Sequence, residues 1–163
     1  MKTRFEVVPL EEVPMEESGA EPIILVVDDD RIVADTLSLI LKRAGYSIMT
    51  AYEPMRALEI VQASRPALLL SDVAMPEMNG VALGIAVCAM HPECNVLLIS
   101  GHATSSDLIA ARNAGHDFKL LEKPVHPTVV LRHVAQYLKK SGKGVKTMPQ
   151  HFHPAASFST EVA

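Results

Sequence analysis

Tryptophan is missing from this chain of 163 residues, and aromatic residues make up only 4% of it. Because 48% of the residues are nonetheless hydrophobic, we expect a core packed almost entirely from aliphatic side chains. Only two cysteines occur, Cys88 and Cys94. They are too few for a disulfide framework or a four-ligand zinc site, and we interpret them as buried thiols in a reducing compartment.

Long apolar stretches are also lacking. No segment approaches the roughly 20 apolar residues of a membrane-spanning helix. The N-terminal region has no hydrophobic segment of the signal-peptide kind, because Pro9, Pro14 and several glutamates interrupt it. The sequence therefore predicts a cytoplasmic protein with no membrane partner.

The net charge of −4 is unevenly spread along the chain. Residues 1–21 hold two basic and six acidic side chains, whereas residues 141–163 hold two lysines and one glutamate. We predict flexible tails at 1–21 and 141–163 around one folded domain at 22–140. The near-neutral middle segment has no basic stripe, which argues against a nucleic-acid partner.

Apolar runs alternate with segments that carry helix signals. The runs predict strands at residues 23–27, 46–51, 67–71, 95–99 and 118–121. Helices are expected at about 31–44, from Pro54, at about 81–90, from Thr104 to Gly115, and from Pro127. Because strands that alternate with helices form βαβ units, we predict an α/β fold with a doubly wound, five-stranded parallel sheet flanked by five helices.

Apolar side chains recur on one face of two of these helices. On the first expected helix the face consists of Val33, Leu37, Ile40, Leu41 and Ala44. On the last one, Val130 and Val134 align with either Tyr137 or Leu138. We expect both faces to pack against the sheet.

Three carboxylates, Asp28, Asp29 and Asp30, directly follow the apolar run 23–27. Adjacent carboxylates repel one another unless a cation offsets their charge, and oxygen ligands of this kind suit Mg2+. Open α/β sheets place their ligand sites at this edge. The alternative is that these residues only cap the next helix. This segment alone leaves both interpretations open.

The other expected strands also end in residues that can carry chemistry. Asp72 ends the third, Ser100 and Gly101 follow the fourth, and Lys123 follows the fifth. Each has a plain alternative: a turn for Asp72, a helix cap for Ser100 and a solvated amine for Lys123. Together at one sheet edge, they could hold Mg2+, supply a carboxylate nucleophile and stabilise a transferred phosphoryl group.

The order of these blocks resembles the receiver domain of two-component response regulators, over roughly residues 22–140. The blocks are Val27-Asp28-Asp29-Asp30, then Leu70-Ser71-Asp72-Val73-Ala74-Met75-Pro76-Glu77-Met78-Asn79-Gly80, then Ser100-Gly101, and finally Lys123-Pro124. The resemblance implies a flavodoxin-like receiver fold and a phosphoprotein of two-component signal transduction. It also implies a cofactor, Mg2+, and a partner, a sensor histidine kinase or histidine phosphotransfer protein.

The resemblance implies a role for each matching residue. Asp72 is expected to be the phosphoacceptor, with Ser100 as the hydroxyl that follows the phosphoryl group and Lys123 as its cationic partner. Mg2+ is expected to be bound by Asp28, Asp29, Asp72 and the backbone carbonyl of Ala74. We further predict a cis peptide bond at Lys123–Pro124.

The sequence departs from the family pattern before Lys123. The family often has an aromatic residue three positions before the lysine, where this chain has Leu120, and Phe118 lies two residues further back. Either a bulge lets Phe118 take that position, or the domain signals without an aromatic switch.

We therefore predict a stand-alone receiver that is not an enzyme beyond self-phosphorylation and self-dephosphorylation. It would signal through protein–protein contact, by the face of its fourth helix, fifth strand and fifth helix, or through onward phosphotransfer. One alternative is an aspartate-nucleophile phosphatase. Such an enzyme has its nucleophile in a D-x-D arrangement after the first strand, and Asp28-Asp29-Asp30 contains this spacing. Another is an interaction module that has lost phosphorylation.

Overall fold

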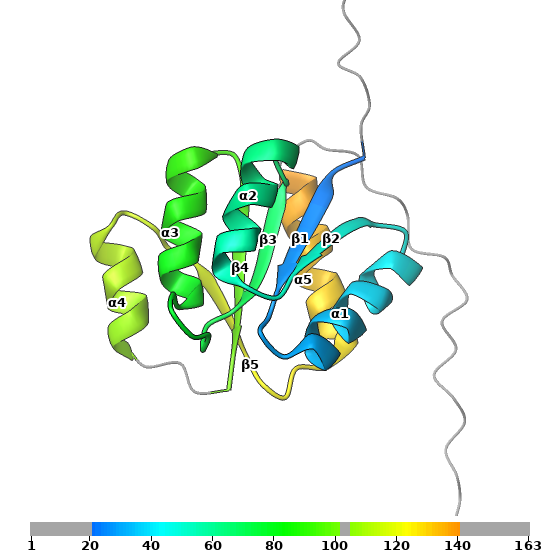
Figure 1. The fold of residues 1–163 in the computed structure, drawn as a ribbon. Coiled ribbons are helices and arrows are strands. Elements are labelled where there is room, and N and C mark those ends of the chain that lie inside the picture. Colours follow the sequence, from blue (N-terminus) through cyan, green and yellow to red (C-terminus); the bar gives the residue numbers. More distant parts are fainter. Residues whose placement is uncertain (1–20, 102–104, 141–163) are drawn as a thin grey trace, which may run out of the picture.

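The computed structural model of the protein describes residues 21–101 and 105–140, in which strands and helices alternate strictly (Figure 1). The strands are β1 (Ile23–Val27), β2 (Ser47–Ala51), β3 (Leu68–Asp72), β4 (Asn95–Ser100) and β5 (Lys119–Glu122). The helices are α1 (Arg31–Arg43), α2 (Pro54–Ser64), α3 (Gly80–Met90), α4 (Ser105–Asn113) and α5 (Pro127–Lys140).

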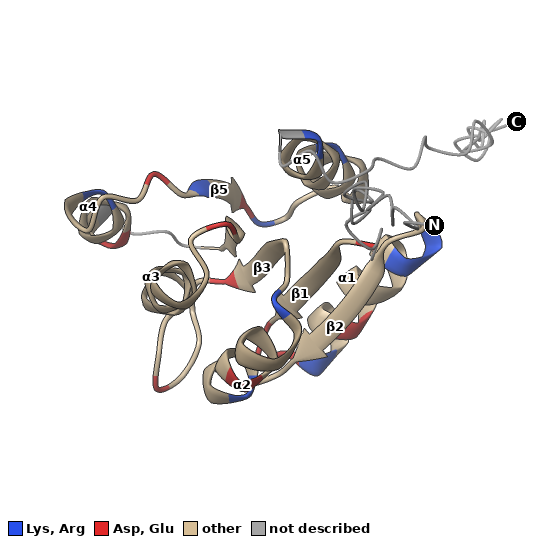
Figure 2. Ribbon diagram, turned by 90° about the horizontal axis from the view of Figure 1, so that it is seen from above, with Lys and Arg blue, Asp and Glu red and all other residues tan. Residues whose placement is uncertain are grey.

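All strand pairs are parallel, and the strand order is β2-β1-β3-β4-β5. One face of the sheet packs against α1 and α5, and the other packs against α2 and α3 (Figure 2). A buried residue of α4, Ala111, joins the cluster on the second face. The predicted fold class, a doubly wound α/β protein with five parallel strands, is therefore confirmed.

The central strands are apolar along their whole length because helices cover both of their sides. In β1, Ile24 and Val26 pack in the cluster beneath α1 and α5, whereas Leu25 and Val27 pack in the cluster beneath α2 and α3. The same alternation runs along β3, which is buried at every position. The core is mainly aliphatic, as the scarcity of aromatic residues predicted.

The helix ends follow local signals in the sequence. Asp30 caps α1, where its Oδ1 accepts the N–H groups of Ile32 (2.9 Å) and Val33 (3.3 Å). Gly45 follows α1 with φ of 93°, a conformation that glycine adopts without strain. Asn79 caps α3 by accepting the N–H of Ala82 at 2.8 Å.

The buried face of α1 differs from the predicted one. Ala34, Ser38 and Leu41 are buried, whereas Val33, Leu37, Ile40 and Ala44 are only half-buried. The side chains of Ser38 and Thr50 of β2 share a hydrogen bond of 2.8 Å, which turns this polar position inward. The predicted face was based on apolar residues alone. It therefore did not include Ser38, whose hydroxyl has a hydrogen-bond partner on the sheet.

The remaining elements lie close to their predicted positions. On α5 the buried line is Val130, Val134 and Leu138, and Tyr137 is half-buried. The predicted start of the fourth helix at Thr104 lies outside the described residues, as do the two predicted tails up to residue 20 and from residue 141. Each helix in the described ranges is too short or too polar to cross a membrane.

Candidate functional site

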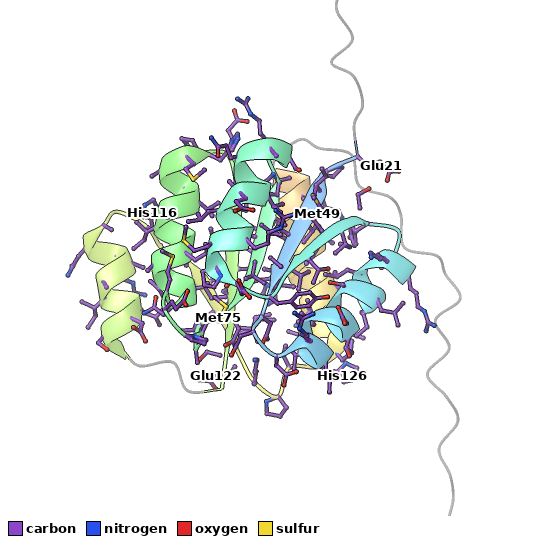
Figure 3. The ribbon with its side chains drawn as sticks, in the orientation of Figure 1. Glu21, Met49, Met75, His116, Glu122 and His126 are labelled. Carbon is purple, nitrogen blue, oxygen red and sulfur yellow. The ribbon has the colours of Figure 1, made fainter. Side chains whose placement is uncertain are left out.

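The side chains of Asp28 and Asp72 point to the same side of the sheet. Val26 of β1 and Leu70 of β3 both pack in the cluster beneath α1 and α5. Since side chains alternate along a strand, the residues two positions further on, Asp28 and Asp72, point to that side as well. Both residues lie at the carboxyl edge of the sheet. This edge is at the bottom of Figure 3, where Glu122 and His126 are labelled.

Three carboxylates meet at this edge. Carboxylate oxygens of Asp28, Asp29 and Asp72 all lie within 4.8 Å of one another. Asp28 is 3% exposed and Asp72 is 6% exposed, whereas Asp29 faces solvent. Buried like charges at this separation are unfavourable unless a cation stabilises them.

Lys123 supplies one positive charge to this cluster. Its Nζ lies 2.6 Å from Oδ1 of Asp72 and 3.3 Å from Oδ2 of Asp28. The Lys123–Pro124 peptide bond is cis, as predicted. The backbone N–H of Lys123 donates to the carbonyl of Ser100 at 2.8 Å, so the ends of β4 and β5 are tied together next to the ammonium group.

The charges of Asp28 and Lys123 depend on each other. Burial raises the pKa of Asp28 above its ordinary value and nearby Asp72 adds to this, while the Asp30 N–H and the Lys123 ammonium act in the opposite direction. Burial lowers the pKa of Lys123, but its hydrogen bond to Asp72 and the charges of both carboxylates raise it more, so the amine stays protonated. The site therefore holds an ammonium ion against crowded carboxylates.

The Asp28–Asp30 run divides between a helix cap and the acidic cluster. Asp30 is the helix cap, as described above. Asp28 instead turns into the cluster, where its Oδ1 accepts the N–H of Asp30 at 2.9 Å. The run thus combines a helix start with two members of the acidic cluster, Asp28 and Asp29.

The other predicted site residues also lie at or next to this edge. Ser100 ends β4 and is fully buried, and the exposed Gly101 follows it. Ala74 is an exposed residue two positions after Asp72. The binding of Mg2+ by its carbonyl stays a prediction.

Gly80 has a structural role that the sequence analysis missed. A Cβ atom at Gly80 would lie 2.0 Å from the carbonyl oxygen of Asp72 and 3.0 Å from Oγ of Ser71. Oγ of Ser71 in turn donates to the Asp72 carbonyl at 2.9 Å. Gly80 and Ser71 thus fix the backbone of Asp72 against the first turn of α3. The glycine at the end of the sequence motif indicated that a small residue is needed at this position. The sequence did not show that the neighbouring group is the Asp72 carbonyl.

The structure also distinguishes Phe118 from Leu120. Leu120 pairs with Leu98 in an unbroken register, so no bulge moves Phe118 into its position. Phe118 instead packs against Gly84 of α3, whose added Cβ would lie 3.0 Å from its ring. Leu120 is half-buried on the same side of the sheet.

The cluster fits a hard divalent cation by its donor chemistry. All three side chains offer carboxylate oxygens, which are the ligands that Mg2+ prefers, and their crowding is relieved by positive charge. Lysines and arginines, by contrast, are dispersed over several elements of the described ribbon (Figure 2).

The fold and this edge define a doubly wound α/β protein with a lysine-paired carboxylate site. Comparison with known families matches residues 24–135 to the response regulator receiver domain. The chain therefore belongs to the response regulator receiver family, as its sequence motifs predicted.

Similar proteins agree with this assignment. The transcriptional regulatory protein PrrA of Mycobacterium tuberculosis is 31% identical over 128 residues, which are 78% of this chain and 54% of PrrA. For GlrR of Escherichia coli the identity is 30% over 118 residues, 72% of this chain and 26% of GlrR. The chain thus spans about half, or less, of the length of these curated relatives.

Solved structures resemble this chain over most of its length. A CheY-like receiver domain from Methanospirillum hungatei superposes with a TM-score of 0.71 and 27% identity, covering 76% of this chain and 98% of the other. For the chemotaxis protein CheY4 of Vibrio cholerae the TM-score is 0.67 with 27% identity, covering 73% and 100%.

Proposed function

We propose that Asp72 accepts a phosphoryl group from a phosphohistidine partner, a sensor histidine kinase or histidine phosphotransfer protein, in a Mg2+-dependent reaction. The observation that carries this proposal is the position of Asp72. It is a buried carboxylate at the end of β3, 2.6 Å from the Lys123 ammonium and beside two further carboxylates. Asp72 can therefore act as a nucleophile, and the Lys123 ammonium is positioned to stabilise the negative charge of the incoming phosphoryl group.

Each residue has a defined part in the transfer. A carboxylate oxygen of Asp72 forms a bond to phosphorus as the phosphorus–nitrogen bond of the donor breaks, and the imidazole leaves. The ammonium of Lys123 then faces the phosphoryl oxygens, and Ser100 offers its hydroxyl to them. Asp28, Asp29, Asp72 and the Ala74 carbonyl would hold Mg2+, which supplies charge neutralisation for the phosphoryl oxygens.

One observation favours this reaction over the phosphatase alternative. A phosphatase of that kind would need both Asp28 and Asp30 directed at its substrate. Asp30 instead uses its side chain to cap α1. We therefore infer a phosphoacceptor and not a hydrolase of phosphomonoesters.

Phosphorylation can be tested by the intact mass of the protein. We expect acetyl phosphate with Mg2+ to add one phosphoryl group, and Asp72→Asn to remove this adduct because the nucleophile is lost. Omission of Mg2+ should also remove it. An adduct that persists in Asp72→Asn, or no adduct on the unchanged protein with any phosphodonor, would refute the assignment.

We further propose that the phosphorylated state is recognised by another protein at the face of α4, β5 and α5, or that the group passes onward to a histidine. The hydrogen bond between Lys123 and Ser100 supports this face, because it links the phosphoryl-binding residues to the ends of β4 and β5. Since Phe118 is packed against Gly84, the change would be carried by backbone shifts and Leu120. A stand-alone, cytoplasmic role stays part of this proposal.

Amide hydrogen exchange with and without beryllofluoride tests the proposed face. We expect protection to change between residues 100 and 125, because beryllofluoride on Asp72 would interact with Ser100 and Lys123. Asp72→Asn provides the control and should show no change. Changes confined to residues 31–65 would exclude this face.

A further inference from the structure

Arg31, the first residue of α1, follows Asp29 by two residues at the sheet edge that carries the acidic cluster, and its side chain contacts Tyr52. Its guanidinium carbon lies 4.3 Å from the centre of the Tyr52 ring, a cation–π contact. The hydroxyl of Tyr52 donates to Oδ1 of Asp35 at 2.7 Å. Asp35 lies one turn after Arg31 on the same helix, so α1 contacts both the ring and the hydroxyl of Tyr52.

The hydrogen bond also fixes the state of the tyrosine. Bonding to Asp35 is the main effect that raises the pKa of Tyr52, with burial and the charge of Asp35 adding to it, whereas Arg31 acts in the opposite direction. The hydroxyl therefore remains a donor at neutral pH. The ring that supports Arg31 stays neutral and oriented.

Sheet register places this arrangement next to Asp28. Ala51 pairs with Val27, and its carbonyl accepts the N–H of Asp28 at 3.3 Å, so Tyr52 follows at the position beside Asp28. Thr50 contacts Ser38 of α1, and Tyr52, two residues on, points to the same side. That is also the side to which Asp28 and Asp72 point.

Among the described residues, a phosphodonor approaching this edge meets three carboxylates and the ammonium of Lys123. The phosphoryl group is itself anionic, so a second cation at the rim favours its approach. A guanidinium carries several N–H groups in a planar fork, and this fork matches phosphate oxygens in pairs. Arg31 is exposed, so this fork is accessible.

We propose that Arg31 is a donor-binding residue, which contacts the phosphoryl group of the incoming donor before transfer while Tyr52 and Asp35 hold the guanidinium at the rim. This inference rests on the proposed phosphorylation of Asp72. It concerns recognition of the donor and not the bond-making step, in which Lys123 takes part.

The test measures initial rates of phosphorylation by intact mass over a range of acetyl phosphate and phosphoramidate concentrations. We expect Arg31→Gln to raise the half-saturating concentration of both donors about tenfold, the size of one lost charge-assisted contact, with little change in maximal rate. Arg31→Lys should recover part of the loss. Tyr52→Ala should resemble Arg31→Gln, whereas Tyr52→Phe keeps the ring and should have a smaller effect.

Two controls separate binding from structure. Arg43→Gln removes an exposed arginine from the last turn of α1 and should leave both kinetic constants unchanged. The beryllofluoride adduct of Asp72 mimics the phosphoryl group after transfer, so its affinity should be equal in Arg31→Gln and the unchanged protein. A weaker beryllofluoride affinity in Arg31→Gln would mean damage to the site and would overturn the inference.

The two donors share the phosphoryl group and differ in what leaves with it. An effect of Arg31→Gln on acetyl phosphate alone would show contact with the acetyl group and would contradict phosphoryl recognition. Equal half-saturating concentrations in Arg31→Gln and the unchanged protein would overturn this inference while the proposed function stands. Absence of any adduct on the unchanged protein would refute the proposed function itself.

Discussion

Replacing Gly80 by alanine is expected to destabilise the protein by about 3 kcal/mol or more, the upper end of the cost of overpacking a core. The added Cβ would lie 2.0 Å from the carbonyl oxygen and 2.9 Å from the carbonyl carbon of Asp72. Both are backbone atoms, which cannot rotate away as a side chain can. Either α3 must move from β3, or the backbone of Asp72 must shift. Thermal melts monitored by circular dichroism measure the loss.

Gly101→Ala is the matched control for this substitution. Gly101 also adjoins the site, but a Cβ there has no neighbour within 4 Å and its φ lies outside the left-handed region. We expect its stability to change by less than about 0.5 kcal/mol. Gly80→Ala would also slow the phosphorylation of any folded fraction, because Asp72 is displaced. Equal melting temperatures for the two variants would contradict the proposed close approach of α3 to Asp72.

Lys123→Met is expected to destabilise the metal-free protein by about 1–3 kcal/mol at pH 7. Removing one partner leaves Asp28 and Asp72 as buried charges without their cation, which costs about 3–5 kcal/mol for a fully buried pair. The Lys123 side chain is 32% exposed, so solvent screens part of the interaction and the lower range applies. Urea unfolding with a chelator present measures this difference, and Lys119→Met, at an exposed residue of β5, provides the control.

The pH dependence of this loss follows from the raised pKa of Asp28. A carboxyl group with a higher pKa in the folded state binds its proton more tightly there, so its protonation favours folding at low pH and this contribution is lost as pH rises through the folded-state pKa. Without Lys123, an attraction that lowers this pKa is gone, and the stability of Lys123→Met should fall more steeply with pH. The difference from the unchanged protein should therefore be smaller at pH 5 than at pH 7. A difference that stays constant over this range would contradict the interpretation.

Asp29→Ala should have the opposite sign in the same experiment. Removing the exposed member of the cluster relieves repulsion, so the metal-free protein should become slightly more stable while its affinity for Mg2+ falls. Asp29 faces solvent, and we therefore expect a smaller change than for Lys123→Met. A clearly less stable metal-free Asp29→Ala would show that Asp29 stabilises the fold in another way.

The fold class and the residues at the sheet edge were predictable from local patterns in the sequence. Both depend on local patterns: apolar runs between helix signals, and a polar residue where each run ends. Asp28, Asp72 and Lys123 were therefore identifiable as site candidates before any distance was known. Parallel strands then bring such ends together, and the nitrogen of Lys123 meets an oxygen of Asp28 across a sequence separation of 95 residues.

The separate roles of these residues depend on contacts between distant segments and were not predictable from the sequence. Asp28 and Asp30 carry the same side chain, and the choice between cluster and helix cap depends on how α1 leaves β1. The role of Gly80 depends on the approach of α3 to Asp72, and the position of Arg31 depends on Tyr52, which follows β2. Each is a contact between separate segments, whose spacing and rotation are fixed by packing across the sheet and leave no periodic trace in the chain.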